Sequence, residues 1–132
     1  MSAAGTAAGE GKLQMTEYMV LLPDNEDTWE RSTPEQREET YARHTEFAAR
    51  LKERGHLITG GAELVHSKTA KTIRATPEGV IVTDGPYAES VEQLSGFYTV
   101  ETNDLDDLVS ICALLAAETP VEIRALVVSD QA

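Results

Sequence analysis

The chain has one cysteine, Cys112, among its 132 residues. A single thiol cannot form an internal disulfide, and it does not provide the paired thiols of cysteine-based zinc sites. Its place on an apolar helical pattern is typical of a thiol that serves only for packing. This cysteine usage favours a reducing compartment, so we expect a cytoplasmic protein.

Basic residues are also scarce: 11 Lys and Arg stand against 23 Asp and Glu, which gives a formal net charge of −12. Such a balance repels the phosphate backbone of nucleic acids, so no nucleic-acid partner is expected. It does not exclude an anionic small substrate, because a few local arginines can outweigh the global charge.

Long apolar runs are absent as well, and none approaches the roughly 20 residues of a membrane span. No membrane partner is therefore expected. The Ala- and Gly-rich segment 1–14 lacks the basic and apolar regions of a signal peptide. We interpret residues 1–14 as a flexible N-terminal extension and residues 15–132 as a single domain.

The rest of the sequence alternates between strand and helix patterns. A helix is predicted from Thr33, an N-cap followed by Pro34 and by Gln36, which completes a capping box; Gly55 ends it. A second helix is predicted after Asn103 as N-cap. Strands are expected at 18–22, 56–64 with a bulge at Gly60-Gly61, 71–75, 79–83, 96–101 and 121–128. This order predicts an α+β domain of ferredoxin-like type, an antiparallel sheet with both helices on one face.

Each predicted helix has an apolar stripe at helical spacing. The first comprises Tyr41, His44, Phe47, Ala48 and Leu51, and the second Leu105, Leu108, Val109, Cys112 and Leu115. His44 is the only histidine on a predicted helix. Alternating apolar residues in the last two strands suit a sheet buried on both faces, which predicts a homodimer.

The run Val-Thr-Asp-Gly-Pro-Tyr-Ala-Glu at 82–89 ends an apolar strand on an acid. Gly85 and Pro86 mark a turn there, which leaves the Asp84 carboxylate free to point into a cleft. Asp84 and His44 form a proton-transfer pair if the fold brings them together.

This run, followed by Glu-Gln-Leu-Ser-Gly-Phe-Tyr at 92–98, resembles the YCII-related (DGPF-domain) family. The segments 18–22, 43–47 and 121–124 agree with it, so the resemblance covers about residues 15–128. It departs from the family at Tyr87, where Phe is expected, and in the N-terminal extension. The resemblance implies a dimeric α/β barrel made by two ferredoxin-like sheets, and a His–Asp pair at His44 and Asp84.

Each candidate residue also has a structural interpretation. A helical histidine is often a hydrogen-bonded core residue, and Asp84 could simply brace its own turn. Arg74 could bind a substrate carboxylate or form a surface ion pair. Tyr87, Tyr98 and Phe97 could line the pocket, although aromatic residues beside a sheet are more often part of a core or interface.

Two other kinds of site are disfavoured. Ser90 and Ser95 lie in no Gly-x-Ser-x-Gly elbow, which argues against a serine triad. No pair of histidines has the helical spacing of His-Glu-x-x-His sites, so no metal is expected.

The first functional hypothesis is therefore a cofactor-free enzyme, an isomerase, lyase or hydrolase acting on a compact organic substrate. The alternative is a non-catalytic small-ligand-binding or regulatory accessory protein of the same fold. A purely structural or regulatory partner protein with no ligand is a third possibility.

Overall fold

The computed structural model describes residues 15–128, so the predicted extension at residues 1–14 lies outside the described part of the chain. Its elements, in chain order, are β1 (Thr16–Asn25), α1 (Glu26–Glu30), α2 (Pro34–Glu53), β2 (Leu57–Glu63), the short 3-10 helix η1 (Ser67–Thr69), β3 (Lys71–Thr76), β4 (Gly79–Asp84), β5 (Glu92–Thr102), α3 (Leu105–Cys112) and β6 (Glu122–Ala125). None of the helices within 15–128 is both long and apolar enough to cross a membrane.

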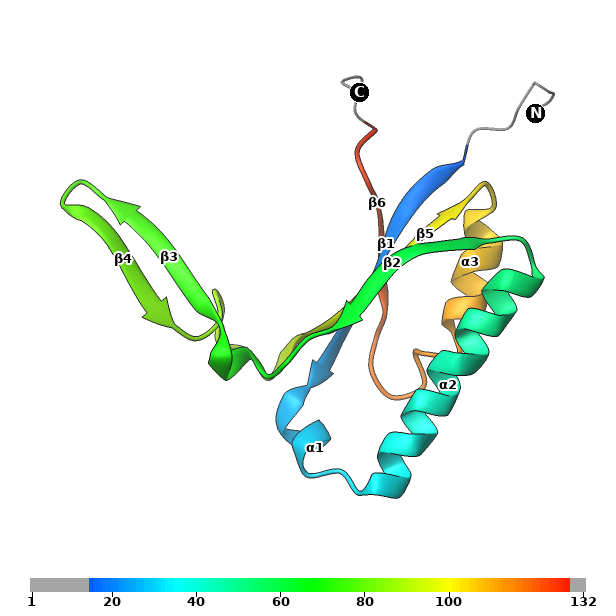
Figure 1. The fold of residues 1–132 in the computed structure, drawn as a ribbon, viewed down its shortest axis with the longest axis horizontal. Helices are drawn as coiled ribbons and strands as arrows, with labels where there is room; N and C mark the ends of the chain where they lie inside the picture. Colours follow the sequence, from blue (N-terminus) through cyan, green and yellow to red (C-terminus); the bar gives the residue numbers. More distant parts are fainter. Residues whose placement is uncertain (1–14, 129–132) are drawn as a thin grey trace.

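Four strands form an antiparallel sheet in the order β2-β5-β1-β6. Helices α2 and α3 lie on the same side of this sheet, as Figure 1 shows. The predicted α+β class is thus confirmed, and the arrangement is consistent with a ferredoxin-like fold. Within residues 15–128 the sheet does not close into a barrel.

The start and end of α2 are as predicted. Thr33 accepts a hydrogen bond from the backbone N–H of Gln36, whose side chain accepts one from the backbone N–H of Thr33. Pro34 is the first helical residue. Gly55 adopts φ = +87°, a left-handed conformation that favours glycine just after a helix. These local signals determine where α2 begins and ends.

The hydrophobic core lies between the sheet and the two long helices. Its buried members are Val20, Phe47, Leu51, Val100, Leu108, Ile111 and Cys112. Burying one large apolar side chain stabilises a fold by about 1.5–3 kcal/mol. The core therefore holds α2 and α3 firmly against β1 and β5.

The predicted register of the second helix was partly wrong. Asp104 rather than Asn103 is the N-cap, and its side chain accepts a hydrogen bond from the N–H of Asp107. Leu105 and Val109 are exposed, whereas Ile111 is buried. The buried stripe consists of Leu108, Ile111 and Cys112, at the i, i+3, i+4 spacing of one helix face.

Two strand ends also differ from the prediction. Strand β1 continues beyond Pro23 to Asn25, because a register shift between Leu22 and Pro23 accommodates the missing N–H. Asn25 then caps the short helix α1, a helix that was not predicted. At the other end of the chain, β6 is limited to Glu122–Ala125.

The predicted irregularity in β2 is confirmed by a register shift between Ile58 and Gly60. A Cβ atom on Gly61 would lie 2.7 Å from the carbonyl oxygen of Phe97, so only glycine allows this close approach of β2 to β5.

Strands β3 and β4 form the predicted hairpin, which extends away from the body on the side of the sheet opposite the helices (Figure 1). Its base is anchored to α1. The backbone N–H and hydroxyl of Ser67 donate to the buried carboxylate of Glu26 at 2.8 and 2.6 Å. A further hydrogen bond closes the base of the hairpin itself: the N–H of Gly85, just after β4, donates to the carbonyl of Ala70, just before β3, at 2.7 Å.

Candidate functional site

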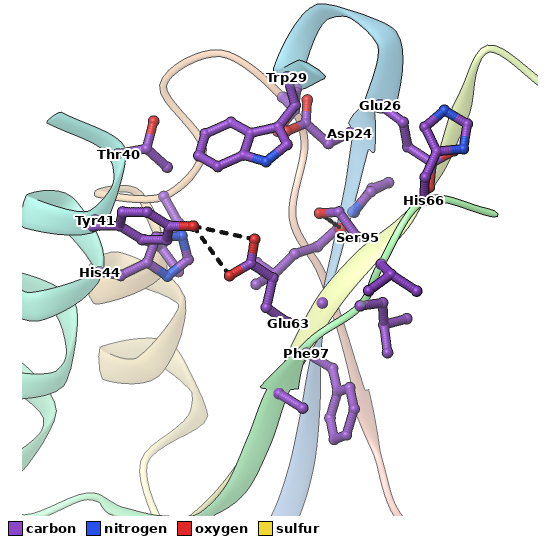
Figure 2. Close-up of a pocket in the computed structure, with 18 of the residues that line it drawn as sticks. Asp24, Glu26, Trp29, Thr40, Tyr41, His44, Glu63, His66, Ser95 and Phe97 are labelled. Atoms are coloured by element: carbon purple, nitrogen blue, oxygen red, sulfur yellow. Dashed lines mark hydrogen bonds and ion pairs between the residues drawn. The ribbon is translucent and has the colours of Figure 1, made fainter. Parts of the chain in front are cut away.

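A cavity of about 960 Å3 lies between α1, the first half of α2, and the ends of β2 and β5. Figure 2 shows its side chains converging from these elements. The lining residues that matter for its chemistry are Asp24, Trp29, Tyr41, His44, Glu63 and Tyr98. The volume is within the range of small-molecule binding sites.

His44 and Tyr98 form the central pair of this cavity. The Nδ1 atom of His44 lies 2.7 Å from the hydroxyl oxygen of Tyr98, and the two rings stack with centroids 5.7 Å apart. Tyr98 in turn packs against the buried ring of Phe47. The His44 Nε2 atom has no hydrogen-bond partner among residues 15–128. The core thus orients an imidazole whose second nitrogen is available to a ligand.

The cavity shifts the pKa of both members of the pair. Burial lowers the pKa of His44, the nearby Arg43 lowers it further, and the Glu63 carboxylate opposes them. Burial also raises the pKa of Tyr98. At neutral pH the pair therefore consists of a neutral imidazole and a protonated phenol.

Tyr41 and Glu63 form a second polar pair in the cavity. The hydroxyl of Tyr41 donates to the Glu63 carboxylate, 3.2 Å from each oxygen (Figure 2). The ring of Trp29 meets that of Tyr41 edge-on at 5.7 Å, and the guanidinium of Arg37 lies over Trp29 at 5.1 Å. Arg37 also donates to the carbonyl of Trp29. This wall is aromatic and held in place by its own contacts.

Asp24 adds a carboxyl group whose proton is held more tightly than usual. Burial raises its pKa, the N–H of Asn25 partly opposes this, and the nearby carboxylates of Glu118, Glu92 and Glu26 add to the increase. The lining of the cavity thus includes this carboxyl group as well as the imidazole of His44.

Two of the five predicted site residues, His44 and Phe97, border this cavity. Alternation along β5 directs the Phe97 side chain to the face of the sheet opposite His44 and Tyr98. Asp84, at the end of β4, instead binds the ammonium of Lys71, and the two side chains are 79% and 63% exposed. It borders a separate hollow beside η1. Within residues 15–128 no hydrogen bond joins His44 to Asp84, so the pair stays a prediction.

The other two predicted binding residues are also outside the cavity. Arg74 lies in the middle of β3, and Tyr87 follows β4 with 84% of its surface exposed. The hairpin carries Arg74 and Asp84 away from the body, and Tyr87 follows at its base. Within one chain, none of the three lines the cavity around His44.

The sequence did not identify Tyr98 as the partner of His44, although a signal was present. Alternation along β5 places Gly96, Tyr98 and Val100 on the helix-facing side, where they meet the inward stripe of α2. Glu63 had no such signal, because the bulge in β2 changes which of its residues face the helices.

A second cluster lies at the base of the hairpin, where ligand-type atoms of Asp27, Glu30 and His66 are within 4.8 Å of one another. The N–H of Lys68 donates to His66 Nδ1 at 3.0 Å, so Nε2 carries a proton toward Asp27. The Lys68 ammonium lies 3.6 Å from Glu30. A metal would need the Nε2 lone pair, so these contacts indicate an anchor for the hairpin.

Two comparisons with known proteins bear on the chain. The family model of the YCII-related domain matches residues 16–120. An uncharacterised protein of Rhizobium meliloti (strain 1021) is 39% identical over 59 residues, which cover 45% of this chain and 48% of that protein. The chain thus spans about half the length of this curated relative.

Proposed function

Because the chain belongs to the YCII-related domain family, we propose that it is a small-molecule enzyme whose acid–base chemistry is centred on His44. The observation that carries this proposal is the 2.7 Å contact between His44 and Tyr98 in the cavity. The supporting electrostatics are the lowered pKa of His44 and the raised pKa of Asp24. The proposed chemistry needs no cofactor.

The proposed mechanism uses the two nitrogens of His44 differently. When Nδ1–H donates to the Tyr98 oxygen, Nε2 has a free lone pair that accepts a proton from a substrate carbon or oxygen. The imidazolium then returns that proton to a neighbouring atom or to a leaving group. This sequence isomerises the substrate or eliminates from it, and Tyr98 acts as a positioning residue.

The proposed substrate is a compact organic molecule. A cavity of about 960 Å3 is at the upper end of the usual size for such ligands. Trp29, Tyr41 and Tyr98 offer apolar surface, and the guanidinium of Arg43 donates only to the hydroxyl of Thr40 among the described residues. A planar molecule that bears a polar group fits this combination.

We also propose that the protein functions as a homodimer, the assembly that the resemblance implies. None of Arg74, Asp84 and Tyr87 lines the cavity of its own chain, so we propose that they line the cavity of the second copy. The predicted His44–Asp84 pair would then form between chains.

A panel of small carboxylic acids, lactones and unsaturated acids would test the proposed activity, with turnover followed by NMR. For any compound turned over, His44→Gln should lower kcat by about 100-fold or more, the scale of lost acid–base catalysis. Glu46→Gln is the matched control, because Glu46 lies on the exposed side of the same helix and, within residues 15–128, pairs only with Arg50.

Two results would contradict an enzymatic role. One is turnover in His44→Gln equal to that of the unmodified protein. The other is a panel compound that raises the melting temperature of both proteins and is never converted, which would indicate a ligand-binding accessory protein instead.

A further inference from the structure

One row of residues crosses the sheet at the cavity with an acid at one end and no side chain in its middle. Glu63 of β2 is directly opposite Gly96 of β5, which is directly opposite Leu22 of β1. Gly96 shares a face of β5 with Tyr98, which contacts His44, so this row faces α2. A Cβ atom on Gly96 would lie 2.9 Å from the carbonyl oxygen of Ala62, which excludes a larger residue there. The cavity floor therefore stays open beside the Glu63 side chain.

The Glu63 carboxylate has acceptor capacity that the protein does not use. Within residues 15–128 only the Tyr41 hydroxyl donates to it, 3.2 Å from each oxygen, which is long for an O–H···O bond. A carboxylate offers about four acceptor positions. Arg37 and Arg43 line the same cavity but donate to other groups. Most of the carboxylate is thus available to a ligand.

Glu63 and His44 face the same space. Figure 2 shows the Glu63 carboxylate on the side of the cavity where Tyr41 and His44 project from α2. Burial and Arg43 lower the pKa of His44 and the Glu63 carboxylate opposes them, so the two groups are within electrostatic reach of each other. Burial and then the Glu63 charge raise the pKa of Tyr41, so its hydroxyl keeps its proton and remains the donor. A ligand that reaches Nε2 of His44 is therefore also beside a free carboxylate.

We propose that Glu63 is the substrate-anchoring residue of the cavity, and that it binds a hydrogen-bond donor of the substrate, a hydroxyl or a primary ammonium. Tyr41 is a positioning residue, because its hydroxyl orients the carboxylate. The apolar part of the substrate lies over the open floor at Gly96 and against the ring of Tyr98, beside Nε2 of His44. The substrate class is therefore a compact hydroxy or amino compound. This inference rests on the proposed function only in taking the cavity as a ligand site.

Three probes with the same benzyl group test the proposal in the full chain. Benzylamine offers an ammonium, benzyl alcohol offers a hydroxyl, and benzyl methyl ether offers no donor. NMR titrations at neutral pH, followed at the amides of Gly61 and Gly96, give the three dissociation constants. At least one donor probe should bind the unmodified protein about 10-fold more tightly than the ether, the scale of a hydrogen bond to a charged group. The tighter of the two donor probes identifies the recognised group as cationic or neutral.

Substitutions then assign this selectivity to the carboxylate. Glu63→Met keeps a chain of similar length and removes the acceptor, so it should reduce the affinity of the donor probes to that of the ether. Tyr41→Phe should weaken the donor probes by a smaller factor and leave the ether unchanged, and it gives an independent test if Glu63→Met folds poorly. Glu46→Met is the matched control, because it makes the same change on the exposed side of α2 and should keep the selectivity.

Three results would each overturn the inference: equal affinities of the three probes for the unmodified protein, no saturable binding of any probe at millimolar concentration, or donor selectivity that persists in Glu63→Met. These readouts do not depend on turnover. A compound whose conversion requires His44, in a protein whose probe binding ignores Glu63, would refute this inference and leave the proposed function standing. Selectivity that depends on Glu63, in a protein that converts no panel compound, would support the inference and contradict only the enzymatic role.

Discussion

His44 is the residue whose environment differs most from what its sequence position alone indicates. A helical histidine is ordinarily part of a core, yet this one has one nitrogen bound to Tyr98 and the other open to a cavity. Burial lowers its pKa, and Arg43 adds to this effect. Its protonation is therefore linked to the stability of the whole domain.

The sign of that linkage gives a prediction. Because the folded pKa of His44 lies below its unfolded value of about 6.5, the unfolded state binds more protons between these two values, and stability falls as pH decreases through that window. His44→Gln removes this contribution. The free energy of unfolding of the unmodified protein should therefore fall more between about pH 8 and pH 5 than that of His44→Gln.

Urea denaturation across this pH range would measure both proteins. All other titratable groups are common to the two proteins, so their contributions cancel in the comparison. Parallel pH profiles for the two proteins would show that His44 is as accessible to protons in the folded state as in the unfolded state.

Asp84 gives a second prediction at the residue scale. Its ion pair with Lys71 joins two largely exposed side chains, and such pairs contribute about 1 kcal/mol or less. Asp84→Asn should therefore leave the free energy of unfolding within about 1 kcal/mol of its original value. Lys71→Gln, which removes the same pair from the other side, is the matched control.

NMR titration of His44 in Asp84→Asn tests the predicted pair directly. In a monomeric sample the titration should not change, because no hydrogen bond joins the two residues within one chain. In a dimeric sample a lowered His44 pKa in the variant would show that Asp84 reaches His44 of the second copy. An altered titration in the monomer would contradict the geometry described here.

At the scale of helices and strands, the sequence was most informative where a local contact determines the structure. The box formed by Thr33 and Gln36 and the glycine at position 55 involve only neighbouring residues, so α2 could be predicted at both ends. The strands of the hairpin could be predicted in the same way, since alternation and a short turn suffice.

Elements that depend on distant contacts were predicted less well. Strand β1 passes through Pro23 because β5 supplies a partner across the bulge, and no local pattern shows this. Asn103 and Asp104 are both good caps, so the choice between them depends on how α3 packs onto the sheet. Packing onto the sheet likewise decides that Ile111 rather than Val109 is in the core.

The candidate site shows the same limit. His44 could be identified from one helix, but its partner comes from β5, 54 residues later. The motif around Asp84 indicated an acid at a strand end, and the structure does place it there. The direction of the hairpin, away from the cavity, could not be read from the motif because tertiary packing determines it.

At the scale of the whole molecule, one buried network joins four elements at the end of the sheet far from the cavity. His56, at the start of β2, has Nδ1 2.6 Å from the Thr102 hydroxyl and Nε2 2.7 Å from Asp107. Arg54, just after α2, donates two hydrogen bonds to the same Asp107 carboxylate. Thr102 and His56 are buried. The network therefore has a structural role: it holds α2, β2, β5 and α3 together.

This network predicts how the domain responds to acid. The hydrogen bonds from Arg54, and then that from His56, lower the pKa of Asp107 below its ordinary value. A carboxyl with a depressed folded pKa stabilises the fold above its unfolded pKa of about 3.9, and this contribution is lost as pH falls through the folded value. Asp107→Asn should therefore lower the melting temperature at neutral pH, and the difference from the unmodified protein should shrink as pH falls below about 4.

Asp106→Asn is the matched control, because it removes an equal charge from the first turn of α3. Equal melting temperatures for the two variants at neutral pH would mean that helix electrostatics alone, and not the buried network, accounts for the effect of Asp107.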